Sequence, residues 1–294
     1  MQMAEGMILK CVAGVYDVYV DGTVLSAYAA GKFRNENLSP VAGDRVALKL
    51  SDRENEKNLI TDVFERRNVL VRPPLANIDT LIITLAVKKP NPDLLLCDQL
   101  ICACRQMGIE PVICINKCDY GQSAELREQF EKSGITVFVT SFNEPETVEK
   151  LKSTLKKGIT CFSGQSAVGK STLTNMLLGR DMFETGGLSK KTERGRHTTR
   201  HTELVMIDEG KWLADTPGFS FMETPFLSPE DFKELYFEFA PYSEKCRFIG
   251  CNHISEPDCA VKEAVENNEL SPLRYERYVE LYNEVKEKWR RRYD

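Results

Sequence analysis

Hydrophobic and polar positions alternate in short stretches over the first part of the chain. They predict strands at residues 7–12, 16–20, 23–29, 44–50 and 59–64. Asp21-Gly22, between two of these strands, is typical of a hairpin turn. Short strands at this density suit a small barrel. An OB-fold is the leading interpretation and an SH3-like barrel the alternative.

From residue 78 the pattern changes to apolar runs that alternate with helical periodicity. The runs at 81–87, 111–115, 136–140 and 159–162 predict buried strands, and residues 93–107, 124–132 and 147–156 predict helices. Strands that alternate with helices indicate βαβ units and a parallel sheet. The fold class expected is therefore α/β for this segment, after a β-barrel.

The remaining residues are mostly helical in pattern, around a cluster of cysteines and one histidine. Ser228-Pro229 and Ser271-Pro272 combine a capping serine with proline at the first helical position, so each predicts a helix start. The second helix is expected to run to about Arg292. With a boundary at Arg72-Pro73-Pro74, we expect domains at 1–72, 73–225 and 226–294.

Composition excludes several classes of protein. Hydrophobic residues make up 42% and charged residues 28%, which is ordinary for a soluble globular protein. We find no export signal and no apolar run of about 18 residues, so a cytoplasmic protein without membrane contact is expected. The net charge of −5 disfavours general nucleic-acid coating but allows local basic patches.

A glycine-rich stretch separates the predicted strand at 159–162 from a helical stretch that begins at residue 172. It matches G-x-x-x-x-G-K-[ST] in full and in the right context. We expect Lys170 to reach the β- and γ-phosphates, where it is also a catalytic residue, and Ser171 to ligate Mg²⁺. The predicted nucleotide contacts here are Gly164, Gln165, Ser166, Ala167, Val168, Gly169, Lys170, Ser171 and Thr172.

Asn116-Lys117-Cys118-Asp119 has the N-K-x-D spacing of guanine-specific sites. Asp119 is expected to accept the hydrogen bonds that guanine donates and adenine does not. Lys117 would pack its stem on the base, and Asn116 would tie this loop to the phosphate loop. Ser141, after the next strand, would supply a backbone contact to guanine O6. Alone, N-K-x-D is more often a polar turn at the end of a strand, and it indicates a guanine site here because a phosphate loop lies on the same predicted sheet.

Two later segments are candidate switches. Asp215 is expected to hold Mg²⁺ through water, and the Gly218 N–H to meet the γ-phosphate. In the polar stretch 180–200, Thr199 is preferred to Thr198 as a Mg²⁺ ligand. His197 is the predicted catalytic residue that orients or deprotonates water, with a solvated loop histidine as the alternative.

The order of these parts is unusual. In ordinary small GTPases the phosphate loop comes first and the guanine-specific N-K-x-D motif later. Here the N-K-x-D motif comes first and the candidate switches come last. Chain termini of a compact domain often lie close together, so such a permutation preserves the fold. The second switch runs directly into the helical tail, and we hypothesise that the tail senses the nucleotide state.

Three cysteines and a histidine cluster near the chain's end. Cys246, Cys251, His253 and Cys259 make a complete Cys₃His set for one structural zinc ion. We expect zinc to hold together a tail that has little core of its own. Coincidental cysteines are the alternative.

Together these motifs resemble the circularly permuted ribosome-assembly GTPases of the RsgA/YjeQ type, over essentially the whole chain. The resemblance implies an N-terminal OB-fold, a permuted GTPase domain and a C-terminal zinc domain. It also implies late maturation of the small ribosomal subunit, stimulation of GTP hydrolysis by that subunit, and a catalytic role for His197.

Binding to rRNA also has a rationale in the residues. An OB-type barrel often binds nucleic acid, and two basic stretches, at 190–200 and 286–292, are suited to phosphates. Solvated basic faces are the alternative.

A non-enzymatic scaffold and an ATP-dependent kinase are the rival functions. A turnover assay tests the scaffold, and the preference for GTP or ATP tests the kinase. A monomer is expected.

Overall fold

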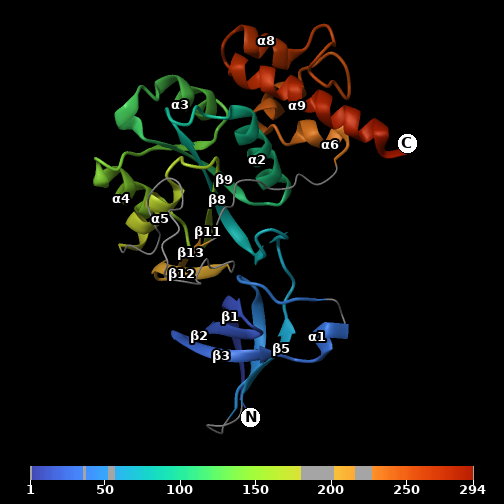
Figure 1. Cartoon of the computed structure of the whole chain (residues 1–294). Coiled ribbons are helices and arrows are strands. Elements are labelled where there is room, and N and C mark those ends of the chain that lie inside the picture. Colours follow the sequence, from blue (N-terminus) through green and yellow to red (C-terminus); the bar gives the residue numbers. More distant parts are fainter. Residues whose placement is uncertain (1, 36–37, 52–56, 180–201, 216–226, 294) are drawn as a thin grey trace. The chain divides into compact units, whose positions relative to one another are not determined.

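The N-terminal segment is a closed five-stranded barrel. The computed structural model describes residues 2–35, 38–51, 57–179, 202–215 and 227–293 (Figure 1). The barrel strands are β1 (Met3–Val12), β2 (Val15–Val20), β3 (Thr23–Ala29), β4 (Arg45–Lys49) and β5 (Asn58–Val63). Their order is β1-β2-β3-β5-β4, with β3 and β5 parallel and the other pairs antiparallel. The OB-type prediction is therefore confirmed.

The barrel's core follows from the alternation in its strands. Ile8, Val18 and Ile60 are fully buried among its apolar side chains. At the tip of the β2–β3 hairpin, Asp21 and Gly22 both have positive φ, of 43° and 88°. That backbone matches the twist of the two strands, which explains why the turn residues predict the hairpin.

A six-stranded sheet forms the middle of the chain. Its order is β10-β9-β8-β11-β13-β12. The strands are β8 (Ile78–Ala86), β9 (Glu110–Asn116), β10 (Thr136–Val139), β11 (Gly158–Ser163), β12 (Glu203–Asp208) and β13 (Lys211–Asp215). β10 runs parallel to β9, and β11 parallel to β13, as predicted.

Some elements escape the sequence patterns. The edge strand β12 is antiparallel to β13, so the sheet is mixed and not wholly parallel as expected. Residues 204–207 of β12 are all apolar, yet only Leu204 is buried, and no strand was predicted there because so short an apolar run does not identify its structure. The other unpredicted elements are α1 (Lys32–Asn35) and the small hairpin of β6 (Val69–Leu70) and β7 (Leu75–Ala76).

The helices between the strands begin and end where the sequence predicts, within a few residues. They are α2 (Leu94–Gln106), α3 (Ala124–Glu131), α4 (Pro145–Thr154) and α5 (Lys170–Leu178), with the 3₁₀ turn η1 (Cys118–Tyr120). Asp93 caps α2 by accepting a hydrogen bond from the Leu96 N–H at 2.9 Å. Gly108, with φ of 67°, follows its end.

The chain divides into two compact units. One contains Met1–Leu81, Lys152–Phe162 and Ser171–Phe219, and the other contains Ile82–Leu151, Ser163–Lys170 and Ser220–Asp294. The loop after β9 and the glycine-rich loop after β11 both belong to the second unit. The C-terminal helices belong to that unit as well, and α9 packs against α2 (Figure 1).

The C-terminal segment is helical, as predicted. It contains α6 (Pro229–Glu234), η2 (Phe237–Phe239), α7 (Ala240–Ser243), α8 (Ala260–Glu266), α9 (Pro272–Arg290) and η3 (Arg291–Tyr293). Ser228 and Ser271 cap α6 and α9 with their side chains, which confirms both predicted starts. None of the helices in the described part of the chain has both the length and the apolar character needed to cross a membrane.

The tail has a substantial core, so the expectation of a tail with little core of its own is wrong. Phe232, Tyr236, Phe239, Tyr278 and Tyr282 are buried together with aliphatic residues of α8 and α9. Tyr278 makes ring contacts with Phe239 and Tyr236 at centroid distances of 4.9 and 4.8 Å. Aromatic residues dispersed in sequence meet here because α6, η2 and α9 pack on one another.

Candidate functional site

The glycine-rich loop has backbone angles that demand glycine. Gly164 and Gly169 have φ of 131° and 103°. A side chain on Gly164 would lie 2.2 Å from the Thr84 carbonyl oxygen, and one on Gly169 would lie 2.5 Å from the Asn116 amide nitrogen. The glycines of the motif therefore permit close packing as well as the turn into α5.

Lys170 lies across this loop. Its Nζ donates to the carbonyl oxygens of Gly164 and Gln165 at 2.6 and 2.7 Å. Burial lowers the pKa of Lys170 from its ordinary value. The ammonium is thus held among backbone groups at the start of α5, where a phosphate would be attracted by both the charge and the helix N-terminus.

Asn116 joins the loop after β9 to the glycine-rich loop. It is fully buried, and its Nδ2 donates to the Val168 carbonyl oxygen at 2.8 Å. Its Oδ1 accepts from the Thr140 hydroxyl at 3.0 Å. The expected tie between the two loops is present, whereas the hydrogen bond from the Thr140 hydroxyl was not predicted, because Thr140 was expected to contribute only through its backbone.

Lys117 makes a second connection between the same loops. It adopts a left-handed backbone conformation, with φ of 62°, at the turn after β9. Its Nζ donates to the carbonyl oxygens of Ala167 and Lys89 at 2.8 and 2.7 Å. These two hydrogen bonds fix the ammonium group of Lys117 between the phosphate loop and the backbone at Lys89.

Asp119 lies at the same edge of the sheet. Its Oδ1 accepts from the Ser141 hydroxyl at 3.1 Å, and its Oδ2 accepts from the Asn143 amide at 3.2 Å. Ser141 thus contacts Asp119 through its side chain, which sequence reasoning did not foresee. Asn143 was missed altogether, because no spacing rule points to it.

Asp215 ends β13, opposite Glu203 of β12. Burial, reinforced by the charge of Glu203, raises the pKa of Asp215 to about 6. Ser171 and Thr172 lie in the first turn of α5. The predicted site residues His197, Thr199 and Gly218 lie outside the described residues.

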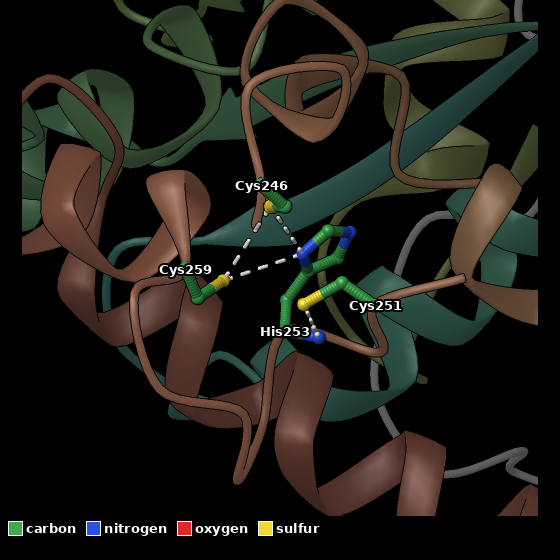
Figure 2. A group of neighbouring side chains, drawn as sticks. All are labelled: Cys246, Cys251, His253 and Cys259. Carbon is green, nitrogen blue, oxygen red and sulfur yellow. Dashed lines mark hydrogen bonds between the residues drawn. The ribbon is translucent and has the colours of Figure 1, made fainter. Parts of the chain in front are cut away.

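Figure 2 shows Cys246, Cys251, His253 and Cys259 converging on one point, with their ligand atoms all within 4.8 Å of one another. Cys246 Sγ lies 3.8 Å from Cys259 Sγ, and His253 Nδ1 lies 3.6 and 3.4 Å from these sulfurs. Tetrahedral zinc with Zn–S bonds of about 2.3 Å separates its ligands by roughly 3.6–3.8 Å. The donor set and its spacing therefore fit zinc.

The ring of His253 is oriented for coordination through Nδ1. Its Nε2 lies 3.2 Å from the Ser243 hydroxyl, which itself donates to the Phe239 carbonyl oxygen at 2.9 Å. That arrangement assigns the ring proton to Nε2 and leaves the Nδ1 lone pair for a metal. Burial lowers the pKa of His253 to about 4 and raises that of Cys251 to about 12. A cation must therefore displace thiol protons as it binds.

The fold and site together define a class of protein. A phosphate loop and an N-K-x-D loop are bonded to each other at the ends of β11 and β9, and the N-K-x-D loop comes first in the chain. This combination is that of a circularly permuted P-loop GTPase. The family model described as RsgA GTPase matches residues 63–225, and the RsgA N-terminal domain model matches residues 5–57. The chain belongs to the RsgA GTPase family.

Relatives and solved structures agree with this assignment. The chain is 39% identical over 287 residues to the small ribosomal subunit biogenesis GTPase RsgA of Alkaliphilus metalliredigens, with 97% of this chain and 98% of the relative covered. It is 41% identical over 297 residues to the protein of that name from Caldanaerobacter subterraneus, with coverage of 100% and 99%.

Two crystal structures share the fold. One is YloQ, a circularly permuted GTPase, with a TM-score of 0.80 and 29% identity over 98% of this chain and 96% of that one. The other is YjeQ from Thermotoga maritima, with a TM-score of 0.79 and 33% identity over 97% and 99%.

Proposed function

We propose that this protein hydrolyses GTP in the cytoplasm during biogenesis of the small ribosomal subunit. The observation that carries the proposal is the pair of hydrogen bonds from Asn116 and Lys117 to the phosphate loop. They join the N-K-x-D loop, which is suited to guanine, to the loop that is suited to phosphates. Nearly full-length similarity to proteins named for small-subunit biogenesis supplies the biological process.

In this proposal Asp119 selects guanine, and the residues 164–172 hold the phosphates, with Lys170 compensating their charge. Ser171, Thr199 and Asp215 would hold Mg²⁺, and the Gly218 N–H would meet the γ-phosphate. Mg²⁺ bound with the nucleotide would neutralise phosphate charge. Gln165 accepts from the Asp93 N–H at 3.1 Å, which supports the loop from α2.

His197 is proposed to orient or deprotonate the attacking water. His197→Ala should slow turnover and leave the affinity for GDP unchanged, as measured by phosphate release and by calorimetry. Loss of GDP binding in that variant would instead give His197 a role in binding.

The cysteine–histidine cluster is proposed to hold one structural zinc ion. The spacing of its donors supports this, as does the hydrogen bond that fixes the His253 ring. We further propose that the functional domains are 1–72, 73–225 and 226–294, and that the protein acts as a monomer. Metal analysis of the purified protein should find one zinc ion per chain.

The decisive experiment compares GTP hydrolysis with and without purified small ribosomal subunits, with ATP as the control nucleotide. We expect slow hydrolysis of GTP alone, faster hydrolysis with subunits, and none of ATP. Preference for ATP would favour a kinase, and absence of turnover under both conditions would favour a scaffold.

Docking on the subunit is proposed to involve rRNA and the basic residues near the end of α9. Since the chain's net charge is −5, this attraction must be local. Binding should therefore weaken steeply between low and high salt in a sedimentation assay. Affinity that is independent of salt would contradict an electrostatic contact.

A further inference from the structure

The carboxylate of Asp119 is held by a small closed network that centres on Asn143. The Asn143 side-chain amide donates to Asp119 Oδ2 at 3.2 Å, and its backbone N–H donates to the Ser141 hydroxyl oxygen at 3.2 Å. That hydroxyl donates to Asp119 Oδ1 at 3.1 Å. Because a hydroxyl has a single hydrogen, accepting from Asn143 helps to direct that hydrogen toward Asp119.

The position of Asn143 is fixed by the backbone of a tight turn. The Glu144 N–H donates to the Ser141 carbonyl oxygen at 3.2 Å, which makes Asn143 the third residue of a four-residue turn. The Thr147 hydroxyl accepts from the Ser141 N–H at 3.2 Å and donates to the Glu144 carbonyl oxygen at 2.6 Å, so the turn is anchored in α4. The turn therefore does not depend on the Asn143 side chain.

A carboxylate offers about four lone-pair positions on its two oxygens. Ser141 and Asn143 occupy one position on each oxygen of Asp119 and fix the plane of the group. The remaining position on each oxygen matches the two donors of guanine, N1–H and N2–H₂. Asp119 is exposed, so without these neighbours its carboxylate would rotate freely and lose that alignment.

We propose that Asn143 is a positioning residue for guanine selection, which acts by locking the carboxylate of Asp119 in the orientation that receives the base. This inference rests on the proposed function, because it assumes that Asp119 reads guanine. Asn143 itself need not touch the nucleotide.

Calorimetric titration of Asn143→Ala with GDP, IDP and ADP tests the proposal. We expect the Kd for GDP to rise about fivefold to tenfold, the loss of one hydrogen bond to a charged group at an exposed site. The Kd for IDP should rise less, because inosine lacks the N2 amino group, and that for ADP should not change. Asn143→Asp should weaken GDP binding further, since two carboxylates would then face each other.

Asn267→Ala, the same change in the exposed cap of α8, is the matched control and should leave every Kd unchanged. An unchanged or tighter GDP complex of Asn143→Ala would overturn the proposal. Equal losses for GDP and ADP, or a lowered Tm, would also overturn it, because they indicate a merely structural role. If the wild-type protein did not prefer GDP to ADP, the proposed function itself would fail.

Discussion

Asn116 shows how one buried amide can link two functional loops. Its Nδ2 reaches the backbone of the phosphate loop only because residue 169 has no side chain, since a Cβ there would lie 2.5 Å away. The asparagine of one motif and the second glycine of the other are thus a single packing unit. A change at either residue should disturb both loops.

The carboxylate of Asp119 should decide the choice of base. Asp119→Asn replaces an acceptor with a donor opposite guanine N1–H, so we expect the Kd for GDP to rise at least about a hundredfold. Titration of a fluorescent GDP derivative measures this change. The circular dichroism spectrum should stay the same, and a variant that kept its GDP affinity would remove Asp119 from base recognition.

Ser243 should tune the affinity of the proposed zinc site without being a ligand. Ser243→Ala removes the partner of His253 Nε2, and loss of such a partner typically weakens metal binding about 10–100-fold. Competition with a colorimetric chelator measures the zinc affinity. Ser255 is an exposed serine in the loop that carries His253. Ser255→Ala is the control and should have the zinc affinity of the wild type.

The sequence revealed the residues of this site that belong to motifs and missed those that support them. Asp119, Asn116 and Lys170 are recognisable because their spacing is fixed by a local strand–loop–helix geometry. Asn143 and Ser243 act through turns and helix ends that bring distant residues together, and a single sequence carries no signal for that proximity.

Helix α2 carries ionic contacts that connect it to the tail within the same unit. Asp98 pairs with Arg274 and Arg277 of α9. Arg105 pairs with Glu238 at 2.9 Å and also donates to the Leu235 carbonyl oxygen at 2.6 Å. Arg274 and Arg105 hold the pKa of Glu238 below its ordinary value in spite of burial. Charges from three separate segments of the chain are therefore paired inside the unit.

Breaking this network should destabilise the tail. Asp98→Asn leaves Arg274 and Arg277 without their shared counter-charge, and loss of a buried partner costs about 3–5 kcal/mol. Urea unfolding followed by circular dichroism measures the effect. Arg291→Met, which loses an exposed pair with Glu287, is the control and should cost no more than about 0.5 kcal/mol. Equal stabilities of the two variants would refute a stabilising role.

Elements with strong patterns were predictable and weak ones were not. The continuous apolar run of β8, the helical periodicity of α2 and the serine caps of α6 and α9 each indicated the element that the structure contains. β12 is an edge strand with only four consecutive apolar residues, 204–207, and a run that short does not by itself distinguish a strand from other structure. The ionic network escaped notice because its members on α2 lie more than a hundred residues from their partners in the tail.

At the scale of the whole molecule, the tail has an aromatic core and, adjoining it through Cys251 and Cys259, the proposed zinc site. Most of the core lies outside residues 244–259 and does not involve the cysteines. We therefore expect zinc removal to loosen residues 244–259 and to leave α6 and α9 folded. Hydrogen exchange with mass spectrometry, before and after chelation, measures this difference. Re-addition of zinc should restore protection, whereas full exchange of α9 in the chelated protein would show that the core cannot stand without the metal.

The packing of α2 has a practical consequence for protein production. Leu95 and Cys102 of this helix pack into the aromatic cluster of the tail, next to Asp98 and Arg105. A recombinant fragment that stopped at residue 225 would expose an apolar strip of α2 together with charged side chains that have lost their partners. Such a fragment should aggregate on purification. A soluble nucleotide-binding fragment must therefore either include residues 227–293 or have the exposed apolar residues of α2 replaced by polar ones.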